Sequence, residues 1–130
     1  MTEVLSVEQE KVIAFRNMVE DEMKEIRLAI GNVGSFTIQS QRDNLVKHIR
    51  DLERCLKDQR QEHQRRLGRN DKRLGRRLTE EGRERYDDRS RHYRQLIMVI
   101  NTYLIKVGYL LSSARNQFKK YEVEDENSSS

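Results

Sequence analysis

Seven basic residues gather within positions 65–77, near the middle of this 130-residue chain. The same stretch holds a single acidic residue, Asp71. Arginine binds phosphate oxygens through two parallel hydrogen bonds, and every phosphate that a basic side chain neutralises releases counterions. The composition therefore predicts a site for an anionic partner, with the RNA or DNA backbone as the leading candidate. The predicted anion-binding residues are Arg65, Arg66, Arg69, Lys72, Arg73, Arg76 and Arg77.

Two other interpretations of this basic stretch stay open. It could bind an acidic protein partner, or it could be a solvated loop that keeps the chain soluble. Because positions 65–77 contain no aromatic residue, a nucleic acid would be held by its backbone rather than through its bases. Acids interleave with arginines over 80–94, as in Glu81 and Arg85, and such i, i+4 pairs stabilise an exposed helix by about 0.2–0.5 kcal/mol each. These acids also weaken the positive field around the basic stretch.

The chain carries no recognisable catalytic or metal-binding pattern. The three histidines, His48, His63 and His92, do not stand with Cys55 at the spacings of a metal-ligand set. The sequence contains neither a glycine-rich phosphate loop nor a nucleophile elbow. We therefore predict a non-enzymatic protein that uses no metal and no cofactor.

Composition favours long helices in a reducing compartment. Charged residues make up 37% and apolar residues 35% of the chain, while Pro, the commonest helix breaker, is absent. A lone cysteine cannot form an intramolecular disulfide, and the first residues lack the basic start and apolar run of a signal peptide. We expect an all-α protein that is intracellular, either cytoplasmic or nuclear.

The second strong signal is a heptad rhythm of apolar residues over 93–121, with a second row beside it. A helix that is apolar over so much of its surface must be covered from more than one side. This excess of apolar surface predicts a homodimer through the helix, and a thick intramolecular core is the alternative. The predicted interface residues are Ile97, Ile100, Tyr103, Leu104, Val107, Leu110, Leu111 and Phe118.

The segment 96–114 is nearly long enough to span a bilayer, which takes about 20 apolar residues. It contains Asn101 and Lys106, and a lysine near the bilayer centre costs about 2.5–3.5 kcal/mol on insertion scales. We therefore expect burial against protein rather than a membrane span.

Three segments show helical periodicity: 7–30, 37–67 and 79–121. Gly68 is a suitable residue to end the second, and Thr79 is a suitable N-cap for the third. The apolar stripe of the first segment is Val12, Phe15, Val19, Met23, Ile26 and Ile30, and that of the second is Ile38, Leu45, Ile49, Leu52 and Leu56.

These lengths predict an antiparallel three-helix bundle with coiled-coil-like packing and a protruding helical hairpin. The expected single domain covers 1–121, the arm 57–92 and the basic tip 65–77, with Leu56 opposite Tyr93. The acidic segment 122–130 is predicted to be a disordered tail. A continuous helix through 68–78 is the alternative to the hairpin.

The combined expectation is a helical assembly protein that self-associates and binds an anionic partner with its basic tip. The alternative is a helical adaptor, or a subunit of a larger protein complex, that makes no contact with nucleic acid.

Overall fold

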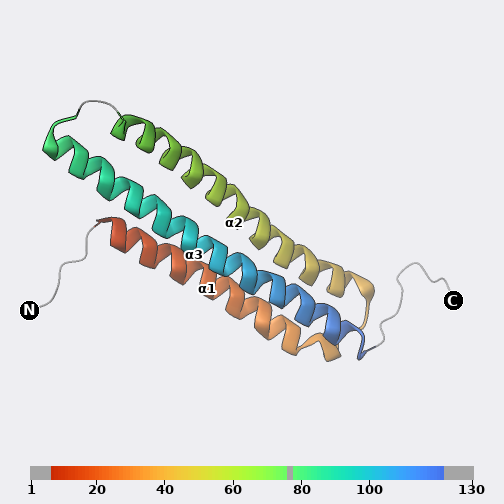
Figure 1. The fold of residues 1–130 in the computed structure, drawn as a ribbon. Helices are drawn as coiled ribbons and strands as arrows, with labels where there is room; N and C mark the ends of the chain where they lie inside the picture. The colour runs from red at the N-terminus through yellow and green to blue at the C-terminus, as the bar shows by residue number, and fades with distance from the viewer. Residues whose placement is uncertain (1–6, 76–77, 122–130) are drawn as a thin grey trace, which may run out of the picture.

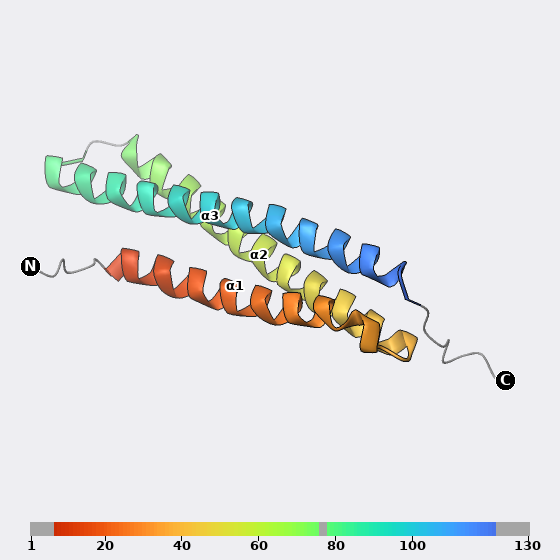
Figure 2. The same ribbon diagram turned by 90° about the horizontal axis from the view of Figure 1, so that it is seen from below.

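The computed structural model describes residues 7–75 and 78–121, and they form an all-α, antiparallel three-helix bundle (Figures 1 and 2). The predicted basic residues Arg76 and Arg77 and the predicted tail 122–130 lie outside these described ranges. The elements are α1 (Val7–Gly31), the short 3-10 helix η1 (Val33–Ser35), α2 (Gln39–Leu74) and α3 (Glu80–Phe118). Figure 1 shows α2 and α3 as a long hairpin, with α1 lying along α3 and beginning at a level short of the hairpin's far end.

The core forms along the predicted stripes of α1 and α2. Phe15 packs against this core while half-buried, and Ile38 is exposed. The other stripe positions confirm the prediction, because each lies inside the bundle. The buried residues are Val12, Val19, Met23, Ile26 and Ile30 on α1 and Leu45, Ile49, Leu52 and Leu56 on α2.

Helix α3 supplies the third side of the core with both of its apolar rows. Leu96, Ile100, Tyr103, Val107, Leu110 and Ala114 are buried within the single chain. The half-buried members of the heptad row pack against the same cluster, among them Leu104, Leu111 and Phe118. Much of the wide apolar surface of α3 is therefore occupied by intramolecular packing, because α1 and α2 cover different sides of the helix.

The corner between α1 and α2 lies at the end of the bundle where α3 ends (Figure 1). Val33 of η1 is fully buried there. The side-chain oxygen of Gln41 accepts hydrogen bonds from the backbone N–H groups of Thr37 (2.6 Å) and Ile38 (3.2 Å), which satisfies donors at the start of α2. Arg42, which interrupts the apolar stripe, lies 4.9 Å over the ring of Phe118 and so connects the start of α2 to the end of α3.

The prediction that the second helix ends at Gly68 is wrong, as is the alternative of one continuous helix. Helix α2 runs on to Leu74, and α3 begins at Glu80. The backbone at Gly68 has an ordinary helical conformation, since no glycine in the described ranges has a positive φ. A glycine ends a helix only where the chain departs from it, and here the seam with α3 continues past Gly68.

Extending α2 changes the register of the hairpin. His63, rather than the predicted Leu56, lies opposite Tyr93, with the two ring centroids 6.3 Å apart. Arg60 donates a hydrogen bond of 2.9 Å to the side chain of Asn101. The basic tip is thus mostly the last turns of α2 instead of a loop. Within the segment predicted as the arm, 57–92, His63 and His92 share a hollow with Glu8 and Lys11 of α1.

The start of α3 confirms the prediction for Thr79. Its side-chain oxygen accepts a hydrogen bond of 3.1 Å from the backbone N–H of Gly82. Glu80 and Glu81 occupy the first turn, where acidic side chains offset the positive end of the helix dipole.

Candidate anion-binding site on the helical arm

A buried polar layer holds the two helices of the arm together. The side-chain amide of Asn70 donates to the hydroxyl of Ser90 (2.7 Å) and to the carbonyl oxygen of Tyr86. The Ser90 hydroxyl in turn donates to the carboxylate of Asp71 (2.8 Å), which lies 3.5 Å from Arg94. Asn70 and Ser90 are only 6% and 2% exposed. A sealed polar layer of this kind fixes which residues face each other, because any slip would leave buried polar groups without partners.

Two of the predicted anion-binding residues are paired within α2. Arg65 and Arg66 contact the carboxylate of Glu62 at 2.6 Å and 2.9 Å. The hydrogen bond from Arg65 lowers the pKa of Glu62, and the same contact raises the pKa of Arg65. All three side chains stay open to solvent, so a partner with several phosphates can compete for the two guanidinium groups.

Arg73 and Arg89 lie on either helix of the hairpin and share one aromatic ring. Each guanidinium carbon is 5.8 Å from the centroid of Tyr86. Sequence reasoning excluded an aromatic from the tip because it searched only 65–77, whereas Tyr86 comes from α3. Arg69 and Lys72 are exposed on α2.

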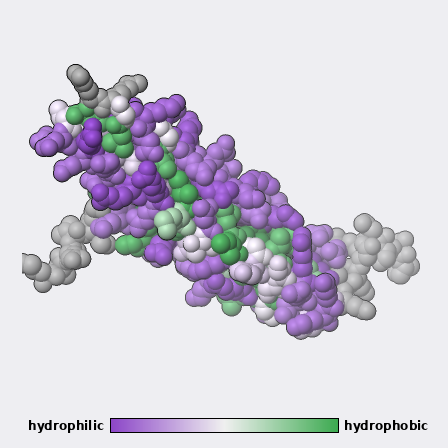
Figure 3. Space-filling model, in the orientation of Figure 1, coloured by the Kyte–Doolittle hydropathy of each residue, from purple (hydrophilic) through white to green (hydrophobic). Residues whose placement is uncertain are grey.

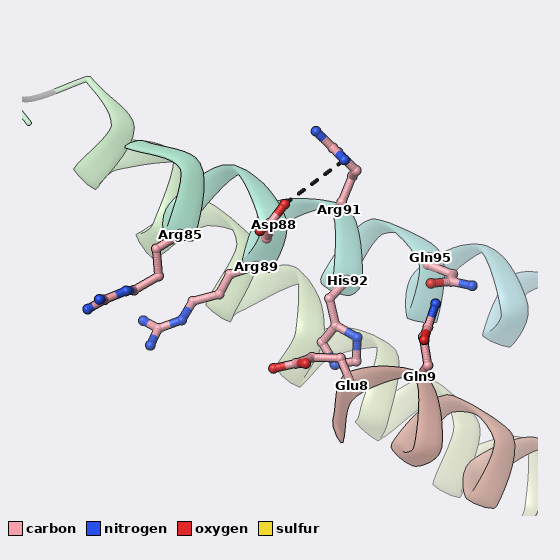
Figure 4. A pocket seen from close by; sticks show the side chains of 8 residues that line it. All are labelled: Glu8, Gln9, Arg85, Asp88, Arg89, Arg91, His92 and Gln95. Carbon is pink, nitrogen blue, oxygen red and sulfur yellow. Dashed lines mark ion pairs between the residues drawn. The ribbon is translucent and has the colours of Figure 1, made fainter. Parts of the chain in front are cut away.

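A groove lies where the first turns of α1 meet the hairpin. It comprises two hollows of about 580 Å³ and 440 Å³ that share Glu8, Arg89 and His92. Figure 4 shows His92 pointing from α3 toward the first turn of α1, where Glu8 lies. We name this feature the head groove, and its principal lining residues are Lys11, Phe15, His63, Arg66, Arg89, His92 and Tyr93.

Two histidines flank Tyr93 inside the head groove. The ring centroid of His92 is 5.7 Å from that of Tyr93, and His63 stacks on the same residue at 6.3 Å. Burial lowers the pKa of both imidazoles, and the positive charge of Arg66 lowers that of His63 further. The Nδ1 atom of His63 is buried and has no hydrogen-bond partner among the described residues. Both rings are therefore held mainly neutral at neutral pH.

The head groove could not be predicted from the sequence, because its residues come from three helices. His63 and His92 are separated by most of the hairpin, and only the turn after Leu74 brings them to the same aromatic ring. The available signal was the heptad position of His63, seven residues after Leu56 on the seam that faces α3.

The predicted interface on α3 divides into covered and partly covered positions. Ile100, Tyr103, Val107 and Leu110 are buried in the core, and the Tyr103 hydroxyl donates to Glu20 at 3.0 Å. Ile97, Leu104, Leu111 and Phe118 are half-buried.

The apolar residues that α3 leaves to solvent are different ones. Met98, Ile105 and Tyr109 are 70%, 63% and 72% exposed. Their spacing of seven and then four residues places them on one face of the helix. On the side of the molecule drawn in Figure 3, hydrophilic surface dominates, and apolar patches occur between the helices along the bundle.

Glu22, Glu25 and His48 form a further cluster between α1 and α2. The Nε2 atom of His48 is 2.8 Å from a carboxylate oxygen of Glu22, and the three potential ligand atoms lie within 4.8 Å of one another. Zinc accepts imidazole and carboxylate ligands of this kind. Glu25 is exposed and the other two are half-buried, and the contact between His48 and Glu22 also serves to join the helices.

Within the described ranges, α3 is the one helix long and apolar enough to cross a membrane, judged by length and composition alone. The core helix of a soluble bundle meets the same criterion.

Comparison of the chain with protein-family models, with curated proteins and with solved structures finds no match.

Proposed function

We propose that this chain is a non-enzymatic helical assembly protein whose arm binds the RNA or DNA backbone. The observation that carries the proposal is the convergence of arginines from two helices. Arg66 and Arg89 line the same hollow, and Arg89 shares the ring of Tyr86 with Arg73. We name Arg66, Arg73, Arg85 and Arg89, together with Tyr86, the arm face.

The charge and geometry of the arm face favour a polyanion over a single small ion. Its four arginines are spread along the last turns of α2 and the first turns of α3, so they can contact successive phosphates. The buried layer of Asn70 and Ser90 keeps the two helices in register and hence keeps the arginines in place. Because contacts to phosphate carry no sequence information, binding is expected to depend weakly on sequence.

The test is a titration of single-stranded and duplex RNA across a salt series. We expect affinity to fall steeply with salt, with a log–log slope of about −0.9 for each phosphate contacted on a duplex. The variant Arg73→Glu with Arg89→Glu should weaken binding at least tenfold and make the slope shallower by about two contacts. The absence of binding at low salt refutes the proposal.

A matched control distinguishes binding at the arm face from binding that depends only on the net charge of the protein. Arg27→Glu with Arg50→Glu makes the same charge change on exposed positions of α1 and α2 away from the arm. It should retain most of the affinity. If the control loses as much affinity as the arm variant, the binding reflects total charge and the arm face is not the site.

We further propose that copies of the chain associate through α3, on the exposed face formed by Met98, Ile105 and Tyr109. Three large apolar side chains at more than 60% exposure on one helical face support this, since such stripes mark interaction surfaces. Ile105→Glu should convert a dimer to a monomer in light scattering, while Leu28→Glu, on an exposed position of α1, should leave the dimer intact.

The second candidate function is a helical adaptor or a subunit of a larger protein complex, without nucleic acid. The same exposed face of α3 favours it, because a different chain could cover those residues. A protein that remains monomeric in light scattering and binds no RNA would favour this candidate over the first.

A further inference from the structure

The head groove has the size of a ligand site. Its hollows of about 580 Å³ and 440 Å³ each fall within the roughly 300–1,000 Å³ typical of small-molecule sites. They share Glu8, Arg89 and His92 and are therefore adjacent. The groove can hold one unit of a polymer whose remaining length follows the arm.

Two kinds of surface meet in the head groove. Lys11, Arg66 and Arg89 bring positive charge from all three helices. Phe15 and Tyr93 bring aromatic carbon to the same hollow. A ligand that fits both surfaces carries a negative charge at one end and a flat apolar ring at the other. A nucleotide unit has this form, because its base stacks on aromatic side chains while its phosphate contacts arginine.

Two histidines, His63 and His92, line the groove and have ring nitrogens that can donate hydrogen bonds. The Nδ1 atom of His63 is buried and meets no hydrogen-bond partner within residues 7–75 and 78–121, and His92 points toward α1 (Figure 4). The positive groups that face them are Lys11, Arg66, Arg85, Arg89 and Arg91, and the negative groups are Glu8, Glu62 and Asp88. Positive charge prevails, so an entering anion would stabilise the protonated imidazoles.

We infer that the head groove binds one phosphodiester and its adjoining base in single-stranded nucleic acid, with His63 and His92 donating hydrogen bonds to the phosphate beside Arg66 and Arg89. This inference rests on the proposed function. The negative charge of the phosphate stabilises the protonated form of both imidazoles and raises their pKa values, so binding takes up protons. The complex then holds more protons than the free protein, and affinity rises as pH falls from about 8 to about 6.

The experiment uses the full chain and a single-stranded hexauridylate without terminal phosphate, whose phosphodiesters keep a constant charge over this pH range. We expect the affinity at constant salt to rise about fivefold from pH 8 to pH 6 for each imidazole whose pKa binding raises by one, with tenfold as the limit at lower pH. His63→Gln with His92→Gln should bind at pH 8 nearly as the unaltered protein does and lose the rise at pH 6.

The third histidine provides the matched control, because His48 lies between α1 and α2 outside the head groove. His48→Gln should keep the full pH dependence. Binding that is independent of pH, or a rise that survives in the His63 and His92 variant, overturns the inference while leaving the proposed function standing. No binding at either pH refutes both.

A second measurement keeps the test decisive if the double variant folds poorly. Nuclear magnetic resonance can follow the two imidazoles in the unaltered protein, free and saturated with hexauridylate. The pKa values of His63 and His92 should rise on binding, and the resonances of His48 serve as the reference outside the groove. Unchanged pKa values for the two groove histidines overturn the inference.

Discussion

The hairpin of α2 and α3 contains two unlike interfaces along the same pair of helices. In the bundle, apolar residues such as Leu56 and Ile100 meet in a core that α1 also covers. In the arm, which extends past the first turn of α1, Asn70 and Ser90 form a buried polar layer in place of apolar residues. Apolar contacts stabilise the helix pair without requiring one particular register. A hydrogen-bonded layer is satisfied in one register only and contributes less to the stability of the fold. The comparison indicates that the bundle supplies most of the stability of the fold, whereas the polar layer of the arm fixes which residues of α2 and α3 face each other.

The largest expected effect is in the bundle. Ile100→Ala removes a fully buried side chain from the shared core, and such substitutions cost about 2–5 kcal/mol through lost burial and the remaining cavity. Urea unfolding measures the change. Leu28→Ala, at a position 61% exposed on α1, should change the free energy of unfolding by less than about 0.5 kcal/mol. Equal effects at the two positions would contradict the placement of the core.

The next effect is in the arm. Asn70→Ala leaves the Ser90 hydroxyl and the Tyr86 carbonyl short of a partner, at a cost of about 1–3 kcal/mol. Hydrogen exchange should show lost protection in the arm while amides of the bundle core keep theirs. Gln61→Ala, exposed on α2, serves as the control. Uniform loss of protection along all three helices would show that the arm and the bundle unfold as one unit.

A smaller effect is expected where the arm turns. Thr79→Ala removes the acceptor for the N–H of Gly82 and should cost about 1 kcal/mol in the free energy of unfolding. Thr79→Ser retains the hydroxyl and should recover most of that loss in thermal or urea unfolding. A serine variant as unstable as the alanine variant would mean that the methyl group, and not the cap, is responsible.

The smallest effect has the opposite sign. Gly68 lies within α2, and a Cβ atom there would meet nothing within 4 Å. Gly68→Ala should therefore stabilise the protein by up to about 1 kcal/mol, measured by the urea midpoint. The similar Gly108→Ala substitution on α3 also meets open space and calibrates the size of the effect. If Gly68→Ala destabilises while Gly108→Ala stabilises, α2 does not continue through Gly68.

Sequence reasoning succeeded where one helix determines the outcome. The stripe of α1, the heptad rows of α3 and the Thr79 cap depend on neighbours three or four residues apart, so the chain displays them directly. It failed at Gly68, because glycine is compatible with both a helix end and a helix interior. That error displaced the whole hairpin, and the pairing of His63 with Tyr93 could not be found from the wrong register.

The sequence by itself determined that the chain is helical, that its helices form a bundle and that positive charge accumulates around 65–77. Local propensity and apolar periodicity act within each helix, so no distant contact was needed. Only the tertiary structure decided that Tyr86 lies between Arg73 and Arg89 and that His63 and His92 share one groove. These contacts join residues from separate helices, and they depend on how far α2 runs before the chain turns. The buried layer of Asn70 and Ser90 sets that register, because a polar layer is satisfied in one alignment and costly in every other.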